Sequence, residues 1–171
     1  NLSYNIFKES HFSNFNVRNN KLKVISYLFD NTDLNNNMIE IIPKYNILSN
    51  LPRRQTFLNN NKIKTIYEKN FDVGNLLHLH LSNNLISNIE NKSFSNLNML
   101  LTLDLSHNFL SSLNENTFLG LHSLYTLNLS NNFLKIINKD QFREVVSLKN
   151  LDLSQNSIKF IENFSSEELN Y

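Results

Sequence analysis

Apolar and polar residues follow one short pattern that recurs along the chain, most clearly between residues 76 and 161. Apolar residues fill the first, fourth and sixth positions of each copy, asparagine fills the ninth, and a second apolar pair fills the eleventh and fourteenth. The copies start 24 residues apart, at Leu76, Leu100, Leu124 and Leu148. Side chains of a strand alternate between its faces, so the fourth and sixth positions predict a short strand with its apolar residues inward. Repetition at this period predicts a solenoid, in which each turn packs only on its neighbours.

The ninth position of the repeat predicts a column of asparagines. Its members are Asn37, Asn61, Asn84, Asn108, Asn132 and Asn156. An asparagine amide both donates and accepts hydrogen bonds, so such a column can pair with backbone groups of its own turn and of adjacent turns. We therefore interpret these asparagines as structural rather than as ligands, and expect the loss of one to cost about 1–3 kcal/mol.

A further apolar column follows five residues after the second apolar pair. It consists of Ile47, Phe71, Phe94, Phe118 and Phe142. We expect these side chains to point inward from the convex side and to stack as a spine along the solenoid axis.

The first third of the chain fits the pattern less well. Arg53 and Thr56 stand where leucine is expected, and the asparagines Asn20 and Asn37 are only 17 residues apart. A full turn of this kind needs roughly 20–29 residues. We therefore expect a single domain, with an irregular or cap-like first turn at residues 1–28 and about six regular turns at residues 29–171.

The leucines, the asparagine column and the phenylalanines together resemble the leucine-rich repeat family, in its typical subclass of 24-residue turns from animal extracellular proteins. The resemblance implies an α/β-type solenoid: a right-handed superhelix with a concave parallel β-sheet and an irregular or short-helical convex side. It also implies protein recognition, as in Toll-like receptor ectodomains or adhesion proteins, at the cell surface. Such proteins usually carry cysteine-rich caps and this chain has no cysteine, so we expect an excerpt of a longer protein. The alternative is a cytoplasmic scaffold with other caps.

The composition argues against several other functions. The formal net charge of +1 disfavours a dedicated nucleic-acid or membrane-surface protein. No apolar run is long enough to span a bilayer, and no signal peptide opens the chain. Without cysteine there is no disulfide or thiolate zinc site, and with only two glycines, Gly74 and Gly120, there is no phosphate-binding loop. We expect no enzyme, metal or cofactor, but a protein ligand or co-receptor, with dimerisation through a repeat face as an option.

We expect the binding surface at the outward positions of the strands. The candidate partner-binding residues are Phe57, Leu77, His80, Leu101, Asp104, Tyr125, Asn128 and Asp152. Leu77, Leu101 and Tyr125, at the second position, predict an apolar stripe with Phe57 close to it, beside an acidic row that starts at Asp33. An exposed aromatic cluster with a polar rim is typical of a protein-binding hot spot. The alternative is that loops or a neighbouring segment cover the stripe.

Three histidines accompany this face. His78 and His80 share one side of a strand, and His107 follows Asp104 in the next copy. Neighbouring strands lie about 4.8 Å apart, so we expect His80 beside Asp104, which favours the protonated imidazole. Three interpretations stay open: solvated polar residues, a pH-sensitive contact and a metal site.

Four triplets fit the N-glycosylation pattern, beginning at Asn1, Asn91, Asn128 and Asn163. Asn91 and Asn163 fall on the return segment, where a glycan leaves the sheet free. We predict that both are used if the protein is secreted. Asn128 lies on the concave strand, where a glycan would block binding.

Overall fold

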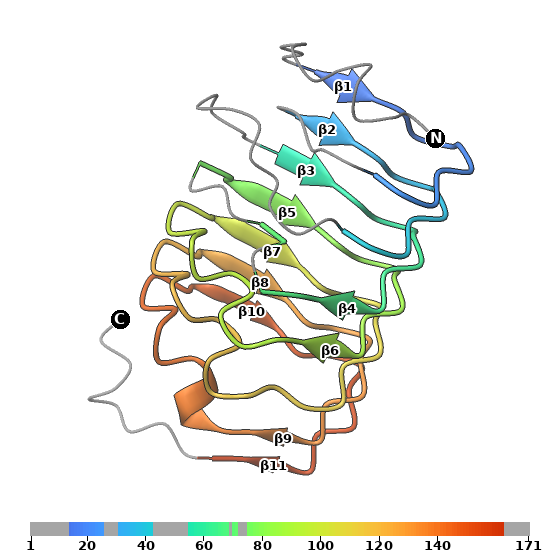
Figure 1. The fold of residues 1–171 in the computed structure, drawn as a ribbon. Coiled ribbons are helices and arrows are strands. Elements are labelled where there is room, and N and C mark those ends of the chain that lie inside the picture. The colour runs from blue at the N-terminus through green and yellow to red at the C-terminus, as the bar shows by residue number, and fades with distance from the viewer. Residues whose placement is uncertain (1–13, 26–30, 43–54, 69, 72–74, 163–171) are drawn as a thin grey trace.

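The computed structural model describes residues 14–25, 31–42, 55–68, 70–71 and 75–162, and these residues form a solenoid (Figure 1). One strand from each turn joins a single sheet in which every pairing is parallel. In spatial order the strands are β1 (Phe15–Asn16), β2 (Thr32–Asp33), β3 (Gln55–Phe57), β5 (His78–His80), β7 (Thr102–Asp104), β8 (Thr126–Asn128) and β10 (Asn150–Asp152). This sheet is the concave face, which confirms the predicted fold.

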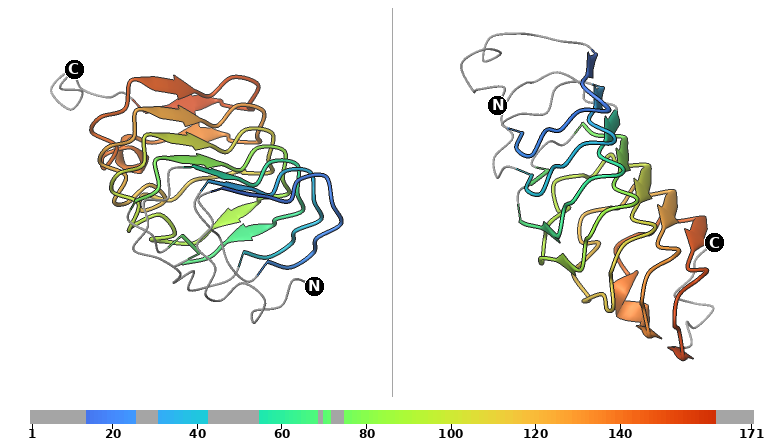
Figure 2. Two further views of the ribbon diagram at one scale, coloured as in Figure 1. Left: turned by 90° about the horizontal axis from the view of Figure 1, so that it is seen from above. Right: turned by 90° about the vertical axis from the view of Figure 1, so that its right-hand side faces the viewer.

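The return segments contain short strands and turns (Figure 2). The strands pair in two small parallel sheets: β4 (Thr65–Ile66) with β6 (Asn88–Ile89), and β9 (Ile136–Ile137) with β11 (Phe160–Ile161). A single turn of 3-10 helix, η1 (Lys139–Gln141), is the helical element of the described residues. The convex side of the described residues is therefore built from short strands and turns, with η1 as its helical turn.

The predicted asparagine column is present and forms a continuous ladder. The amide of Asn108 donates to the carbonyl oxygens of Leu105 and Ser106 in its own turn and of Leu81 in the turn before, at 3.0–3.1 Å. Its Oδ1 accepts the backbone N–H of Ile86, also in the turn before, at 3.0 Å. The same four bonds recur, each in its own register, at Asn37, Asn61, Asn84, Asn132 and Asn156.

The residue before each ladder asparagine has a different reason to be polar. It adopts the left-handed backbone conformation, with φ between 52° and 58°. Asparagine tolerates this region better than most side chains because its short amide can bond locally. The set is Asn19, Asn36, Asn60, Asn83, His107, Asn131 and Gln155. Each turn thus has two successive polar residues with separate roles: the first adopts the left-handed backbone conformation, and the second hydrogen-bonds to backbone groups of two turns. These two roles account for much of the asparagine in this chain.

The interior contains the leucines of the strands and the predicted phenylalanine spine. Phe71, Phe94 and Phe118 are fully buried, and Phe142 packs against the core. The ring centroids of Phe71 and Phe94 lie 6.2 Å apart, and those of Phe118 and Phe142 lie 5.7 Å apart. Ile47, the expected first member of the spine, lies outside the described residues.

A second buried polar column precedes the spine by one residue and was not predicted. The Nδ2 atom of Asn70 donates to the Ile42 carbonyl at 2.8 Å, and the Nε2 atom of Gln141 donates to the Leu113 carbonyl at 2.8 Å. The Ser93 hydroxyl donates to the Ile66 carbonyl at 3.1 Å. These bonds close the convex corner of three turns onto the turn before each, as the asparagine ladder does at the other corner, whereas Thr117 in the same column accepts the Asn114 N–H of its own turn.

The first turn stacks in register despite its short spacing. β1 pairs with β2, and Val24 forms a parallel bridge with Ile41. Thr32 follows Ile25 after seven residues, whereas the corresponding step in the next turn takes fourteen. The shortening therefore lies in the return segment. The predicted bounds 1–28 and 29–171 include residues outside the described ranges and stay a prediction.

Two residues of the early turns, Arg53 and Thr56, stand where the repeat pattern expects leucine. Thr56, like Thr32 beside it in the sheet, takes the inward fourth position and is buried. Arg53 lies outside the described residues.

Replacing Asn108 by alanine tests the ladder. The variant leaves the backbone N–H of Ile86 without its partner. It also removes one of two bonds from the carbonyls of Leu81, Leu105 and Ser106, which keep their bonds from neighbouring turns. We therefore expect the free energy of unfolding to fall by about 1–3 kcal/mol. Denaturant unfolding followed by far-UV circular dichroism measures the change. Asn131→His is the matched control, because His107 already occupies that position, and its effect should stay within about 0.5 kcal/mol. Equal losses in both variants would contradict the assignment.

Candidate binding face

The outward side chains of the concave sheet come from the third and fifth repeat positions. Along β1 to β10 the third positions are Asn14, Asn31, Gln55, His78, Thr102, Thr126 and Asn150, and the fifth are Asn16, Asp33, Phe57, His80, Asp104, Asn128 and Asp152. All fourteen belong to the described residues, and none is lysine or arginine. The three aspartates give this face a negative formal charge, although the whole chain is slightly positive.

Most fifth-position residues also serve the backbone. The Oδ1 atom of Asp104 accepts the N–H of Ser106 at 3.0 Å and its hydroxyl at 2.7 Å. Asn16, Asp33, Asn128 and Asp152 accept the N–H two residues later in the same way, at 2.9–3.2 Å. Hydrogen bonds from the Ser154 hydroxyl and N–H hold the pKa of Asp152 below its usual value. The predicted acidic row therefore caps the ends of the strands as well as facing outward.

Phe57 and His80 are the two exceptions to this capping. In their turns the N–H groups of Asn59 and Ser82 are instead covered by the side-chain oxygens of Asn35 and Asn59, from the turn before, at 2.8 and 3.0 Å. The fifth position is therefore free of its backbone task in two adjacent strands. There the two rings stack, with centroids 4.7 Å apart and planes 11° apart.

The surroundings of His80 correct one part of the prediction. His80 does pair with Asp104 in the sheet register, and that carboxylate raises the imidazole pKa. Burial lowers the pKa by more, and His78 lowers it slightly further, so the pKa of His80 lies below 6.5. The expectation that Asp104 favours the protonated form is confirmed for that carboxylate, but burial, which was not predicted, reverses the net direction of the pKa shift. Half-burial against Phe57 is the physical reason.

His107 does not join the other two histidines. β7 ends at Asp104, and His107 lies in the following turn with φ of 52°, exposed to solvent. Among the described residues no group of three or more histidine, aspartate or glutamate side chains is arranged to hold a metal ion.

The second-position residues Leu77, Leu101 and Tyr125 form a stripe directly before three adjacent strands, β5, β7 and β8. The Leu77 carbonyl accepts the N–H of Leu101 at 2.8 Å, and the Leu101 carbonyl accepts the N–H of Tyr125 at 3.0 Å. Leu101 is 39% exposed and Tyr125 is 48% exposed, while Leu77 is half-buried. Phe57 lies three positions further along its own strand, stacked on His80, so it forms a separate feature.

The glycosylation candidates lie on different surfaces. Asn91 is exposed in the return segment after β6, as predicted, with Ser93 of the same triplet buried. Asn128 is half-buried on the concave face, where its Oδ1 accepts the Ser130 N–H. Asn163 lies outside the described residues.

One exposed row was missed by the sequence interpretation. Leu85, Phe109 and Phe133 occupy the tenth position of three consecutive turns and are 38%, 49% and 51% exposed. The sequence could have indicated this row, because leucine and phenylalanine replace the lysine, methionine or serine that fills the tenth position in the other turns.

A stacked solenoid with an outward sheet of polar and aromatic side chains defines a recognition protein of the repeat class. The sequence profile described as "Leucine rich repeat" matches residues 57–110, 100–158 and 122–169. These matches cover more than half of the chain, so the protein belongs to the leucine-rich repeat family.

Solved structures share this fold. Of the 156 chains that match, one is in the crystal structure of the TLR13–ssRNA13 complex, at a TM-score of 0.74 and 25% sequence identity. The match covers 85% of the present chain and 25% of that receptor chain, so this chain spans about a quarter of its length. No curated protein matches the sequence. Within the described residues, no helix has the length and hydropathy needed to cross a membrane.

The lowered pKa of His80 predicts a pH dependence of stability. An imidazole in the unfolded chain binds its proton near pH 6.5, before the folded protein does, so stability falls as the pH drops through 6.5 and levels off below the folded pKa. His80→Asn, which introduces the residue of the same position in β8, should reduce this loss between pH 7.5 and 5. His107→Asn is the control, because asparagine is common at that position. Equal slopes for wild type and His80→Asn would refute the assignment.

Proposed function

We propose that this chain is a non-enzymatic protein-recognition module in the ectodomain of a Toll-like or adhesion-type receptor, and that it binds a protein partner through its concave face. The observation that carries the proposal is the stripe of exposed Leu101 and Tyr125 with half-buried Leu77, each directly before one of three adjacent strands. An apolar centre with a polar surround is the usual anatomy of a protein-binding hot spot. Proteins of this repeat family are generally non-enzymatic, which supports the absence of catalysis.

The charge of the face favours a protein over a nucleic acid. The structural relative was solved with an RNA, ssRNA13, so RNA is the natural rival partner. Nucleic-acid binding depends on lysine and arginine side chains that neutralise phosphates. The third and fifth positions of the seven turns supply no such side chain and carry three carboxylates, while the second-position row beside them adds one lysine, Lys149. A phosphate backbone laid along these positions would meet repulsion rather than neutralisation.

A receptor ectodomain is favoured over an intracellular scaffold, which is the alternative. The likeness to a receptor chain over 85% of the present chain supports the first. Asn91 supports it as well, since its exposed position on the return segment accepts a glycan without covering the sheet.

The stripe is tested by placing a photo-crosslinking phenylalanine analogue at Tyr125 of the full-length protein in its native cells. We expect a discrete protein adduct from this position and none from Val146, which is 63% exposed but lies beyond the sheet in the same turn. Tyr125→Ala and Leu101→Ala should each weaken binding of that partner by about tenfold or more. Their melting temperatures should change little. Adducts with nucleic acid, or loss of the fold in both variants, would contradict the proposal.

Glycosylation separates the two locations. If the full-length protein enters the secretory pathway, intact-mass analysis should find a glycan at Asn91 that is lost in Asn91→Gln. The control is Asn128→Gln, which should leave the mass of the glycan unchanged. An unmodified Asn91 in protein taken from its native cells would favour the intracellular scaffold.

A further inference from the structure

A row of apolar side chains lines one edge of the solenoid, beside the asparagine ladder. The backbone N–H groups of Leu85, Phe109 and Phe133 donate to carbonyl oxygens of the preceding turn at 2.8–2.9 Å. The three residues therefore stand in register on consecutive turns, about 4.8 Å apart. The rings of Phe109 and Phe133 stack, with centroids 5.7 Å apart and planes 27° apart. They are half exposed all the same.

The fold does not require apolar residues at this position. The same tenth position holds Lys21, Met38, Lys62 and Ser157 in the other turns of the described stack. Met38, Lys62 and Ser157 donate to the same ladder of backbone bonds, at 2.8 Å to the Leu22 carbonyl, 2.8 Å to the Ile39 carbonyl and 3.0 Å to the Leu134 carbonyl respectively. The two stacked phenylalanines thus expose apolar surface to water although the fold does not need an apolar side chain at this position.

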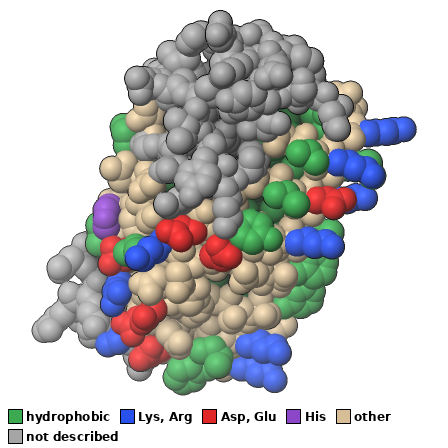
Figure 3. Space-filling view, viewed as in Figure 1, with side chains coloured by type: hydrophobic (Ala, Val, Ile, Leu, Met, Phe, Trp, Pro, Cys, Tyr) green, Lys and Arg blue, Asp and Glu red, His purple; other side chains and the backbone are tan. Residues whose placement is uncertain are grey.

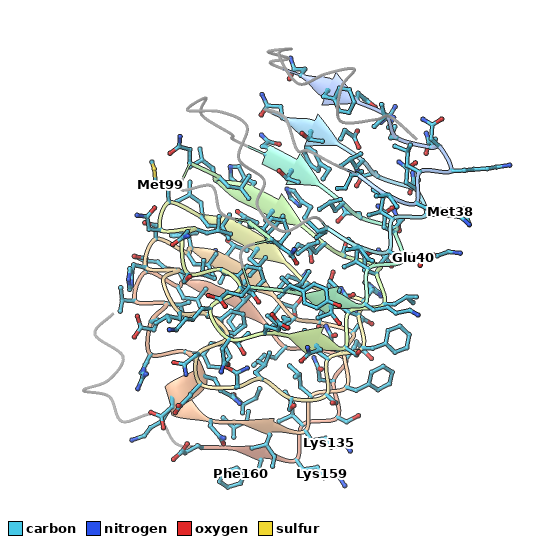
Figure 4. All side chains as sticks on the ribbon, in the orientation of Figure 1. Met38, Glu40, Met99, Lys135, Lys159 and Phe160 are labelled. Atoms are coloured by element: carbon cyan, nitrogen blue, oxygen red, sulfur yellow. The ribbon has the colours of Figure 1, made fainter. Side chains whose placement is uncertain are left out.

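Lysines stand at both ends of the row. The exposed twelfth position, two residues further along each turn, holds Lys64, Ser87, Ser111, Lys135 and Lys159. Lys62, at the tenth position, adds a fourth lysine, and no aspartate or glutamate occurs at either position between residues 62 and 159. Figure 4 places Met38, Glu40, Lys135 and Lys159 along this side. Figure 3 shows lysine or arginine and hydrophobic side chains gathered there, with an acidic side chain between them near the upper end. We call the tenth and twelfth positions from Lys62 to Lys159 the basic–aromatic edge.

We propose that the basic–aromatic edge is a second docking site, and that it binds an acidic segment of a partner protein which anchors an apolar side chain on Phe109 and Phe133. The apolar centre with charged ends matches the anatomy of a protein interface. Four lysines, with Glu40 of the preceding turn as the neighbouring carboxylate, leave a net positive charge that selects a partner of negative charge and steers and orients it. The site is independent of the concave face, whose carboxylates favour the opposite charge.

Other occupants fit the edge less well. A symmetric dimer would bring the same edge of two copies together, so lysines would face lysines. A single-stranded nucleic acid needs open ring faces for its bases, but each phenylalanine already presents one face to the other ring. The lysines also stand at the two ends of the row rather than along a continuous groove.

Selection from a random twelve-residue peptide library on the immobilised full-length protein tests the proposal. We expect enrichment of peptides with aspartate or glutamate on both sides of an aromatic or leucine residue. Phe109→Ser combined with Phe133→Ser is the test variant, because Ser157 fills the same position in the last turn. The affinity of selected peptides, measured by fluorescence anisotropy, should fall by about tenfold or more in this variant. It should also weaken as salt is raised.

Matched variants separate charge from packing and from misfolding. Lys64→Ser with Lys135→Ser removes two charges with a residue already found at that position in Ser87 and Ser111, and should weaken binding most at low salt. Val146→Ser removes an exposed apolar side chain elsewhere in the Phe133 turn and should leave binding unchanged. If the double phenylalanine variant loses its cooperative unfolding transition, Phe133→Ser alone replaces it.

Four results would overturn the proposal. The first is that no peptide is enriched, and the second is that basic peptides are selected. The third is that the phenylalanine and lysine variants bind the selected peptides as tightly as the wild type does. The fourth is that another occupant binds more tightly than the peptides and needs Phe109 and Phe133 to do so. The last is measured with oligouridylate, with phosphatidylserine vesicles and, for self-association, by sedimentation equilibrium. None of these results bears on the crosslinks from Tyr125, so the two sites fail independently.

Discussion

Each turn of this protein is closed by a side chain that reaches back to the turn before it. The side-chain amide of every ladder asparagine donates one hydrogen bond to the preceding turn and accepts another from it. Its other two hydrogen bonds go to carbonyls of its own turn. Asn20, in the first described turn, donates to the carbonyls of Val17 and Arg18 in its own turn and is exposed. A turn therefore folds fully only on a neighbour, and the register of one turn sets the register of every outward side chain in the next.

Function enters such a repeat where a position is released from its structural task. The fifth position normally caps the strand end with aspartate or asparagine. Phe57 and His80 do not cap their strands, because the side-chain oxygens of Asn35 and Asn59, each in the preceding turn, accept the N–H groups of Asn59 and Ser82 instead. The tenth position needs only its backbone, so its side chains vary from lysine to phenylalanine. Aromatic residues on the concave face and on the edge thus occupy positions where the solenoid tolerates them.

The repeat pattern of the sequence predicted those features of the fold that recur in every turn. The strands, the asparagine ladder and the phenylalanine spine follow from residues that every turn repeats, and the structure confirms them. The buried column of Asn70, Ser93, Thr117 and Gln141 escaped prediction because four residue types share one position, each with its own reach. The net pKa direction of His80 was missed for a related reason. The Asp104 charge is visible in the sequence, whereas the burial that outweighs it depends on how Phe57 packs.

Net charge is a poor guide to partners in this fold. The chain as a whole carries +1, which taken alone argues against binding any strongly charged molecule. The repeat sorts charges by position, however, and each position becomes a separate surface. Carboxylates fall on the fifth position of the sheet, and lysines outnumber the single carboxylate, Glu40, at the tenth and twelfth positions of the described turns. Two faces of opposite sign then stand on one nearly neutral molecule, and each can select a partner that the other repels.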